Sequence, residues 1–250
     1  MCGIIGIVGG KIPERKWGDA YSLIRNLFLE CEHRGKDATG YVARTAPFDK
    51  PSAATTLVAK QPMMASRFVE TTEFTRLAHR RCSSFIGHCR AATQGSPKDN
   101  RNNHPHVGER LVMVHNGVCE NVDDLRDKYL LDLETDCDSE AILRLIETQP
   151  PASGLMLAMR EVKGSMALAA YDLEADCVWL ASNGGRPLWI AHLTRLRSWV
   201  FASTGEIILR AMKEAFGKRA DGLLDVLMPL PDYTPVALTP SGLVFSARTV

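Results

Sequence analysis

The sequence has little that would indicate a nucleic-acid surface, a membrane span or a targeting segment. Its 30 basic and 29 acidic side chains nearly balance, so no net charge favours a nucleic acid or a membrane as a partner. No apolar run approaches the roughly 20 residues of a membrane-spanning helix, and no basic-then-apolar signal peptide opens the chain. We therefore expect a cytoplasmic protein that folds as a single domain over residues 1–250.

The seven cysteines also exclude two classes of small domain. They are odd in number and form no CxxC pair, which argues against a disulfide framework and against a zinc ribbon. We expect all of them except Cys2 to be reduced and mostly buried as small apolar residues.

Cys2 differs from the other cysteines because it directly follows the initiator methionine. Removal of Met1 would give a terminal residue that carries a thiol nucleophile and an α-amine, which titrates near about 7.7–8.0 and can accept the thiol proton. Taken alone, a second residue that happens to be cysteine is the simpler interpretation. The rest of the chain has to decide between the two.

Hydrophobic spacing predicts strands and helices in blocks. The apolar run 4–8 predicts a buried strand, and apolar residues at three- and four-residue steps predict a helix over 14–31. A helix is also expected over 65–80, and Ser203 with Glu206 resembles a capping box for the helix that follows. Further strands are expected over 41–44, 56–59, 84–88, 111–115, 166–171, 177–181, 188–192, 199–202, 235–238 and 243–246, with a turn at 240–242, and further helices over 123–131, 139–148, 154–162 and 207–216. This arrangement favours an α+β fold of stacked antiparallel sheets covered by helices.

Two polar segments contain arginines with alternative interpretations. In HRGKDATG, residues 33–40, Arg34 and Asp37 form either a charged turn or a pair that braces a loop beside a site. In GHCRAATQG, residues 87–95, Arg90 ends an apolar strand and presents either a planar fork to a carboxylate or a surface ion pair.

Two further segments contain an amide and a carboxylate. The side chain of Asn116 and the backbone N–H of Gly117 can donate to an oxyanion, although Asn-Gly is also a common turn. In TDCDSE, residues 135–140, an aspartate precedes a helix and serves either as an N-cap or as a partner for a substrate ammonium.

The segment between these motifs is strongly polar. GSPKDNRNN, residues 95–103, is predicted to pack poorly and to form a lid. His104 and His106 share a face, but no third ligand stands at metal-site spacing nearby. We therefore expect no metal and assign these histidines to structural hydrogen bonds.

Taken together, the motifs can hold an amino acid by its carboxylate and ammonium groups with its side chain facing Cys2. The segments MCGIIGIVG, HRGKDATG, GHCRAATQG, NNHPH, HNGVCEN and TDCDSEAI, in this order and spacing, resemble the glutaminase domain of class II glutamine amidotransferases. The likeness extends through 185–188 and 202–206, and so covers nearly the whole chain. It implies an N-terminal-nucleophile hydrolase with a four-layer αββα sandwich, which converts glutamine to glutamate and ammonia through a thioester on Cys2 without a cofactor.

The resemblance also implies roles for single residues. Arg90 matches the arginine that holds the substrate carboxylate, and Thr93 matches its hydroxyl neighbour. Asp138, rather than Asp136, matches the acid that binds the α-ammonium. The other matches are Asn116 and Gly117 to the oxyanion hole, Arg34 and Asp37 to the loop behind the site, and Gln94 to a substrate-side position where aminosugar synthases have histidine.

The sequence departs from the family in two respects. Ala91 stands where relatives usually have an aromatic residue, and Gln94 replaces the histidine. Relatives mostly have a second domain that uses the ammonia, so we expect this chain to supply a separate synthase subunit. The alternatives are an amidohydrolase that acts on a γ-glutamyl or related amide, and a non-catalytic subunit that binds glutamine for regulation.

Overall fold

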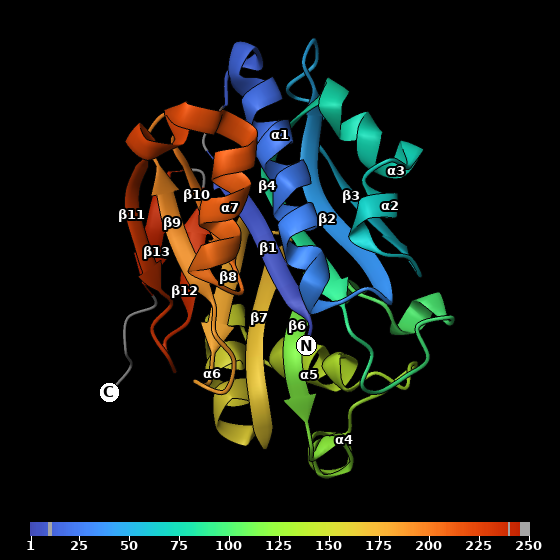
Figure 1. Cartoon of the computed structure of the whole chain (residues 1–250). Helices are drawn as coiled ribbons and strands as arrows, with labels where there is room; N and C mark the ends of the chain where they lie inside the picture. Colours follow the sequence, from blue (N-terminus) through green and yellow to red (C-terminus); the bar gives the residue numbers. More distant parts are fainter. Residues whose placement is uncertain (10–11, 240, 246–250) are drawn as a thin grey trace.

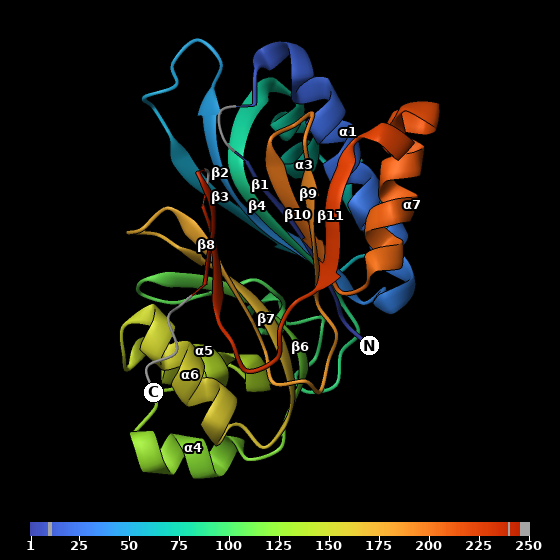
Figure 2. The same ribbon diagram turned by 90° about the vertical axis from the view of Figure 1, so that its left-hand side faces the viewer.

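The computed structural model describes residues 1–9, 12–239 and 241–245. Two antiparallel sheets lie face to face in it, between two groups of helices (Figures 1 and 2). This is the four-layer α+β sandwich that the sequence predicts. None of the helices within the described residues is long and apolar enough to cross a membrane.

The strands of each sheet come from separate parts of the chain. The first sheet has the order β11 (Leu224–Pro229), β9 (Trp189–Leu193), β10 (Ser198–Ala202), β1 (Gly3–Gly9), β4 (Arg80–Arg90), β2 (Ala38–Pro47) and β3 (Thr55–Gln61). The second has the order β13 (Gly242–Phe245), β12 (Val236–Thr239), β8 (Cys177–Ser182), β7 (Gly164–Asp172), β6 (Leu111–Cys119) and β5 (His106–Val107). The N-terminal strand β1 is therefore central, between β10 and β4.

Helices cover the outer face of each sheet (Figure 2). The first sheet is covered by α1 (Glu14–Cys31), α2 (Ala65–Phe68), α3 (Thr72–Thr75) and α7 (Gly205–Phe216). The second is covered by α4 (Val122–Tyr129), α5 (Asp138–Glu147) and α6 (Pro151–Glu161). Short 3₁₀ turns lie at Glu32–Arg34, Arg76–His79, Asn100–Asn102 and Gly217–Gly222.

The core has three apolar layers, one at each interface between the four layers of helices and sheets. Ile4, Val8 and Ile86 of the first sheet pack against Val114 and Ala167 of the second, and all are fully or almost fully buried. The other two layers lie between each sheet and its helices. Alternate residues of β1 thus face opposite apolar layers, which explains why its apolar run is continuous rather than alternating.

The helix expected over 65–80 is wrong, because two short helices and a 3₁₀ turn occupy these residues. The hydroxyl of Thr71 donates to the carbonyl of Phe68 at 2.7 Å, and the backbone of Thr71 is extended. Such a local hydrogen bond competes with continued helix. The break lets both Phe68 and Phe74 pack edge-on against Phe28 of α1.

The capping box at Ser203 is also wrong. Thr204 is the N-cap of α7, and its hydroxyl accepts from the N–H of Ile207. The hydroxyl of Ser203 instead accepts from the N–H of Ile4 at 2.9 Å, and Ser203 donates its own N–H to the carbonyl of Ile4. A tertiary partner therefore replaces the local one, and it fixes β1 close to Cys2.

The remaining helices and strands agree with the predicted ones within a few residues, and two short strands were not predicted. These are β5 and the partly exposed β11, which has a register shift against β9. Residues 240 and 246, which were assigned to the last turn and the last strand, lie outside the described residues.

Candidate active site

Strand pairing brings Cys2 next to Arg90. In the register of β1 with β4, Gly3 lies opposite Cys89, so the residue before one strand meets the end of the other. The thiol of Cys2 lies 3.3 Å from the carbonyl oxygen of Ala91 and 3.4 Å from its N–H. Residues 89 positions apart in sequence therefore meet because two central strands are antiparallel.

The environment of Cys2 is apolar enough to keep its thiol protonated. Burial raises the pKa of Cys2 to about 11, although the Ala91 backbone, the terminal amine and Arg90 act in the opposite direction. Met1 precedes Cys2 and is 69% exposed. The thiol thus needs a base before it can act as a nucleophile at neutral pH.

Arg34 and Asp37 hold the backbone around Cys2 separately rather than as a pair. The Nε–H of Arg34 donates to the carbonyl of Cys2 at 2.9 Å. The carboxylate of Asp37 accepts from the N–H of Ala92 at 2.8 Å, and its own N–H donates to the carbonyl of Arg90. The predicted Arg34–Asp37 ion pair is therefore not formed, but both side chains brace segments on which Cys2 rests.

Arg90 is a buried cation with neutral partners. Its guanidinium donates to the Asn103 side-chain oxygen at 2.7 Å and to the carbonyls of Gln94 and Gly95 at 2.5 and 2.9 Å. No described carboxylate forms an ion pair with it, and Arg90 is only 2% exposed. The surface ion pair considered from the sequence is thus wrong. A guanidinium has five N–H donors, more than these acceptors take up.

The second sheet supplies the opposite wall of the site. A ring nitrogen of His88 in β4 lies 2.9 Å from the carbonyl oxygen of His115 in β6, which ties the two sheets together just before Asn116. The side-chain nitrogen of Asn116 is buried and has no hydrogen-bond partner among the described residues. A buried donor without a partner is costly, so its presence marks a position where a ligand oxygen fits.

Gly117 follows in β6 and has no room for a side chain. A Cβ at this position would overlap the carbonyl oxygen of Ser165 and would lie 2.5 Å from a ring nitrogen of His115. Asn116 and Gly117 belong to a strand paired with β7, so the Asn-Gly turn considered from the sequence is wrong. Glycine is required here for the close approach of β7 rather than for a turn.

Asp138 begins α5 but does not cap it. The N-cap of α5 is Cys137, with no side-chain capping bond. The carboxylate of Asp138, buried at 4% exposure, accepts from the N–H of Cys119 at 2.8 Å and from the hydroxyl of Ser139 at 3.4 Å. Asp136, the alternative, is exposed. Of the two aspartates, only Asp138 is buried against β6.

The polar segment over 95–103 is partly packed. Thr93 and Gln94 are exposed, whereas the side chains of Asn102 and Asn103 are buried and donate to the carbonyls of Ser96 and Pro97. The expectation that this segment packs poorly is therefore wrong at its end. Asn103 was not predicted as a site residue, although it lies in the NNHPH motif and accepts the bond from Arg90.

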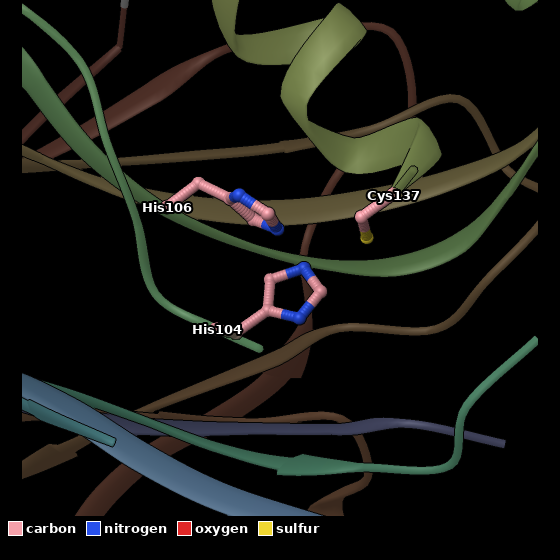
Figure 3. A group of neighbouring side chains, drawn as sticks. All are labelled: His104, His106 and Cys137. Atoms are coloured by element: carbon pink, nitrogen blue, oxygen red, sulfur yellow. The ribbon is translucent and has the colours of Figure 1, made fainter. Parts of the chain in front are cut away.

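The structure brings a third potential metal ligand to the two histidines. His104, His106 and Cys137 are buried, and their ligand atoms lie within 4.8 Å of one another (Figure 3). Structural hydrogen bonding, as expected from the sequence, does not describe His104, because neither ring nitrogen has a partner among the described residues. Sequence spacing missed Cys137 because it lies on a different segment, 31 residues after His106.

Two stacked antiparallel sheets between helices are the fold of the N-terminal-nucleophile hydrolase type, and the sequence comparisons identify a glutamine amidotransferase domain. A family described as "Glutamine amidotransferase domain" matches residues 88–210, a stretch that contains Arg90, Asn116 and Asp138 but begins after Cys2. The glutamine–fructose-6-phosphate aminotransferase of Oceanobacillus iheyensis is 31% identical over 199 residues, which is 76% of this chain and 30% of that protein. A Rhizobium meliloti enzyme of the same name is 34% identical over 203 residues, with 77% and 30% covered.

Solved structures show the same fold. The glutamine phosphoribosylpyrophosphate amidotransferase of Bacillus subtilis superposes with a TM-score of 0.69 at 20% identity, covering 98% of this chain and 49% of that one. A glutamine aminotransferase class-II domain protein from Silicibacter pomeroyi has a TM-score of 0.55 at 11% identity and covers 98% of both chains. These findings support a class II glutamine amidotransferase domain in this chain, which spans about 30% of the length of the curated relatives it matches.

Proposed function

We propose that this chain hydrolyses the side-chain amide of glutamine to glutamate and ammonia, with Cys2 as the nucleophile. The observation that carries the proposal is the contact of the Cys2 thiol with the backbone of Ala91, directly after the buried Arg90. The side-chain nitrogen of Asn116, on the second sheet, is buried with no hydrogen-bond partner among the described residues. Each of these groups suits one part of glutamine.

The head group of the substrate would lie between Arg90 and Asp138. Arg90 is a buried cation without a carboxylate partner, so it suits the α-carboxylate of an amino acid. Asp138 is a buried carboxylate that three neutral donors hold in place, so it suits the α-ammonium. Thr93 and Gln94 border the same loop and would limit the space beside the carboxylate.

The reaction would follow in two steps. After loss of Met1, the amine of Cys2 takes the thiol proton, and the thiolate attacks the side-chain carbonyl carbon. The oxyanion receives hydrogen bonds from Asn116 and Gly117, and the C–N bond breaks as the amine passes the proton to the leaving ammonia. Water then attacks the γ-glutamyl thioester, which releases glutamate and restores the thiol. Arg34 and Asp37 keep the Cys2 carbonyl and the 90–92 backbone in position.

Glutamine turnover by the Cys2→Ala variant tests this proposal. We expect ammonia and glutamate in equal amounts from the unmodified chain and a loss of at least about 10⁴-fold in kcat for Cys2→Ala, as for other removed nucleophiles. Cys177→Ala, a change at another buried cysteine, should retain the activity. Faster turnover of larger γ-glutamyl amides than of glutamine would contradict the assigned substrate.

A second candidate function, glutamine binding without hydrolysis, is favoured by the state of Cys2 in the unprocessed chain. With Met1 in place, the nitrogen of Cys2 is an amide, and the pKa of the thiol is about 11. Such a chain has a substrate site but no base on its nucleophile. N-terminal sequencing decides between the two, because the exposed side chain of Met1 is accessible for removal.

We further propose that the ammonia serves a separate synthase subunit. The curated relatives are named as aminotransferases, so in those proteins the nitrogen of glutamine passes to an acceptor. A synthase that uses free ammonia, and that uses glutamine only when this chain is added, would support this part. Nitrogen transfer to an acceptor by the isolated chain would contradict it. The cytoplasmic location and the single domain over 1–250 stay predictions.

A further inference from the structure

Three buried side chains form a cluster that the proposed hydrolysis does not use. His104 and His106 lie just before and at the start of β5, and Cys137 lies at the N-terminus of α5. Figure 3 shows the two imidazole rings and the sulfur directed toward one common space. Each of the three side chains is at most 5% exposed, and their ligand atoms lie within 4.8 Å of one another.

Ring nitrogens of both histidines in this cluster lack partners among the described residues. Neither ring nitrogen of His104 nor Nε2 of His106 has a hydrogen-bond partner among the described residues. A buried polar atom without a partner is costly. One ring nitrogen from each histidine faces the common space, and a ligand there would offset this cost.

Hydrogen bonds from residues outside the cluster hold the backbone of its two segments in place. The N–H of Asp136 donates to the side-chain oxygen of Asn102 at 3.0 Å. The ammonium of Lys60 donates to the carbonyls of Asn103 and Pro105 at 2.6 and 3.1 Å. These bonds fix the backbone on both sides of His104 and next to Cys137. The geometry of the cluster therefore does not depend on contacts among the three side chains themselves.

We infer that His104, His106 and Cys137 bind one transition-metal ion of the zinc class, with a fourth position open to water or another ligand. Two imidazoles and a thiolate are the donors that Zn²⁺ prefers, whereas Mg²⁺ and Ca²⁺ prefer oxygen. With Zn–N near about 2.0–2.1 Å and Zn–S near about 2.3 Å, the ligand atoms of a tetrahedral site lie about 3.3–3.6 Å apart. The present cluster, whose ligand atoms lie within 4.8 Å of one another, reaches this geometry if its widest separation closes by at most about 1.2–1.5 Å.

The charges around the cluster also affect the binding of a cation. Lys60 and Arg90 place positive charge near His106, whereas the carboxylate of Asp138 places negative charge near Cys137. Binding displaces the thiol proton of Cys137 to solvent, and the resulting thiolate offsets one of the two metal charges. The cysteine is therefore the ligand on which binding depends most.

The metal would connect two groups of the proposed glutamine site. Asn103, which accepts from Arg90 at 2.7 Å, precedes His104. Asp138 follows Cys137, whose sulfur lies 3.8 Å from the Asp138 carboxylate. A metal would thus clamp the carboxylate side to the ammonium side. This consequence rests on the proposed function, whereas metal binding itself does not.

Titration of the metal-free, phosphine-reduced full chain with Co²⁺ tests the inference without any activity assay. We expect one equivalent to bind with a near-ultraviolet thiolate-to-cobalt band and tetrahedral visible bands, and Zn²⁺ to displace it. Cys137→Ala should remove the near-ultraviolet band and weaken Co²⁺ binding by about a hundredfold or more, because the soft ligand is lost. His106→Gln should weaken binding in the same direction while the near-ultraviolet band remains at saturating Co²⁺.

Two matched variants separate this site from other thiols. Cys177→Ala removes a different buried cysteine and should bind Co²⁺ as the unmodified chain does. Cys2→Ala should also bind normally. Absence of stoichiometric binding, or binding that is unchanged in both Cys137→Ala and His106→Gln, would overturn the inference, and so would binding lost in Cys2→Ala. Metal binding in a chain that does not hydrolyse glutamine would reject only the proposed function.

Discussion

The two walls of the site differ in how completely their polar groups are satisfied. On the wall formed by the first sheet, Cys2 and Asp37 bond to nearby backbone, and Arg90 has three oxygen partners. On the wall formed by the second sheet, His104 and Asn116 retain buried polar atoms with no partner among the described residues. Most polar groups of the first wall are thus bonded to the protein, apart from Nη2 of Arg34, whereas the second wall retains donors and acceptors that a ligand can satisfy.

Of the changes to the first wall, Arg90→Ala should weaken glutamine binding most. It removes the charge-assisted bonds to a substrate carboxylate and leaves the oxygens of Gln94, Gly95 and Asn103 without their donor. We expect a loss of about 2–5 kcal/mol in glutamine binding, measured as a rise in KM or by calorimetry.

Arg81→Ala is the matched control for this change. It removes an arginine from the opposite end of the same strand, β4. Its KM for glutamine should stay close to that of the unmodified chain. Equal effects of the two variants would show that loss of an arginine from β4, rather than loss of a carboxylate partner, weakens binding.

Asn116→Ala tests the unpartnered amide of the second wall. If this amide stabilises the oxyanion, kcat should fall by about 10²–10³-fold with little change in KM. Because the side-chain nitrogen of Asn116 has no hydrogen-bond partner within the described part of the chain, the stability of the fold should change little.

For Asn121→Ala we expect the opposite result, a loss of stability without a loss of kcat. Both ends of the Asn121 amide are bonded, to the Glu161 carbonyl and to the N–H of Lys163. Its removal should therefore lower the melting temperature and leave kcat of the folded fraction unchanged. Thermal denaturation and steady-state kinetics on both variants sharpen the comparison, and a stability loss in Asn116→Ala with unchanged kcat would contradict it.

The pH dependence of Cys2 alkylation distinguishes the unprocessed chain from the processed one. Because burial raises the pKa of Cys2 to about 11, the thiolate fraction of the chain with Met1 should rise about tenfold per pH unit between pH 7 and 9. After Met1 removal, the rate should level off above about pH 8, where the terminal amine is unprotonated. Rates of iodoacetamide labelling at Cys2, followed by peptide mass analysis, measure both profiles. Two identical profiles would show that the amine does not assist the thiol.

Asp37→Ala should have the smallest effect of these changes. Asp37 is exposed, and its carboxylate holds only the N–H of Ala92. Loss of one such bond costs about 0.5–1.5 kcal/mol, so we expect a fall of about threefold to tenfold in kcat/KM. A loss as large as that of Arg90→Ala would give Asp37 a direct role in binding.

Local patterns predicted most of the fold, but not its long-range contacts. The helix over 14–31 can be predicted from one apolar stripe. The seven buried residues of α1 all lie within this single segment, so a local pattern is enough to find it. Ser203 was misassigned because its best partner, the N–H of Ile4, is 199 residues away. No local pattern reports such a contact.

The same limit applies to the candidate site. Motifs identified Arg90, Asn116 and Asp138 individually, and the register of β1 with β4 then brings Cys2 next to Arg90. The cluster of Cys137 with His104 and His106 had no such signal, because the N-terminus of α5 and the start of β5 are about 30 residues apart in sequence and meet only through the tertiary fold.

Intact-mass measurement after treatment with a glutamine-mimicking electrophile tests the central claim most directly. The account predicts a chain without Met1 that gains one adduct, which maps to Cys2, is prevented by excess glutamine and is absent in Cys2→Ala. A processed chain that gains no adduct, or one whose adduct maps to another cysteine, would contradict the claim that Cys2 is the nucleophile of a glutamine site.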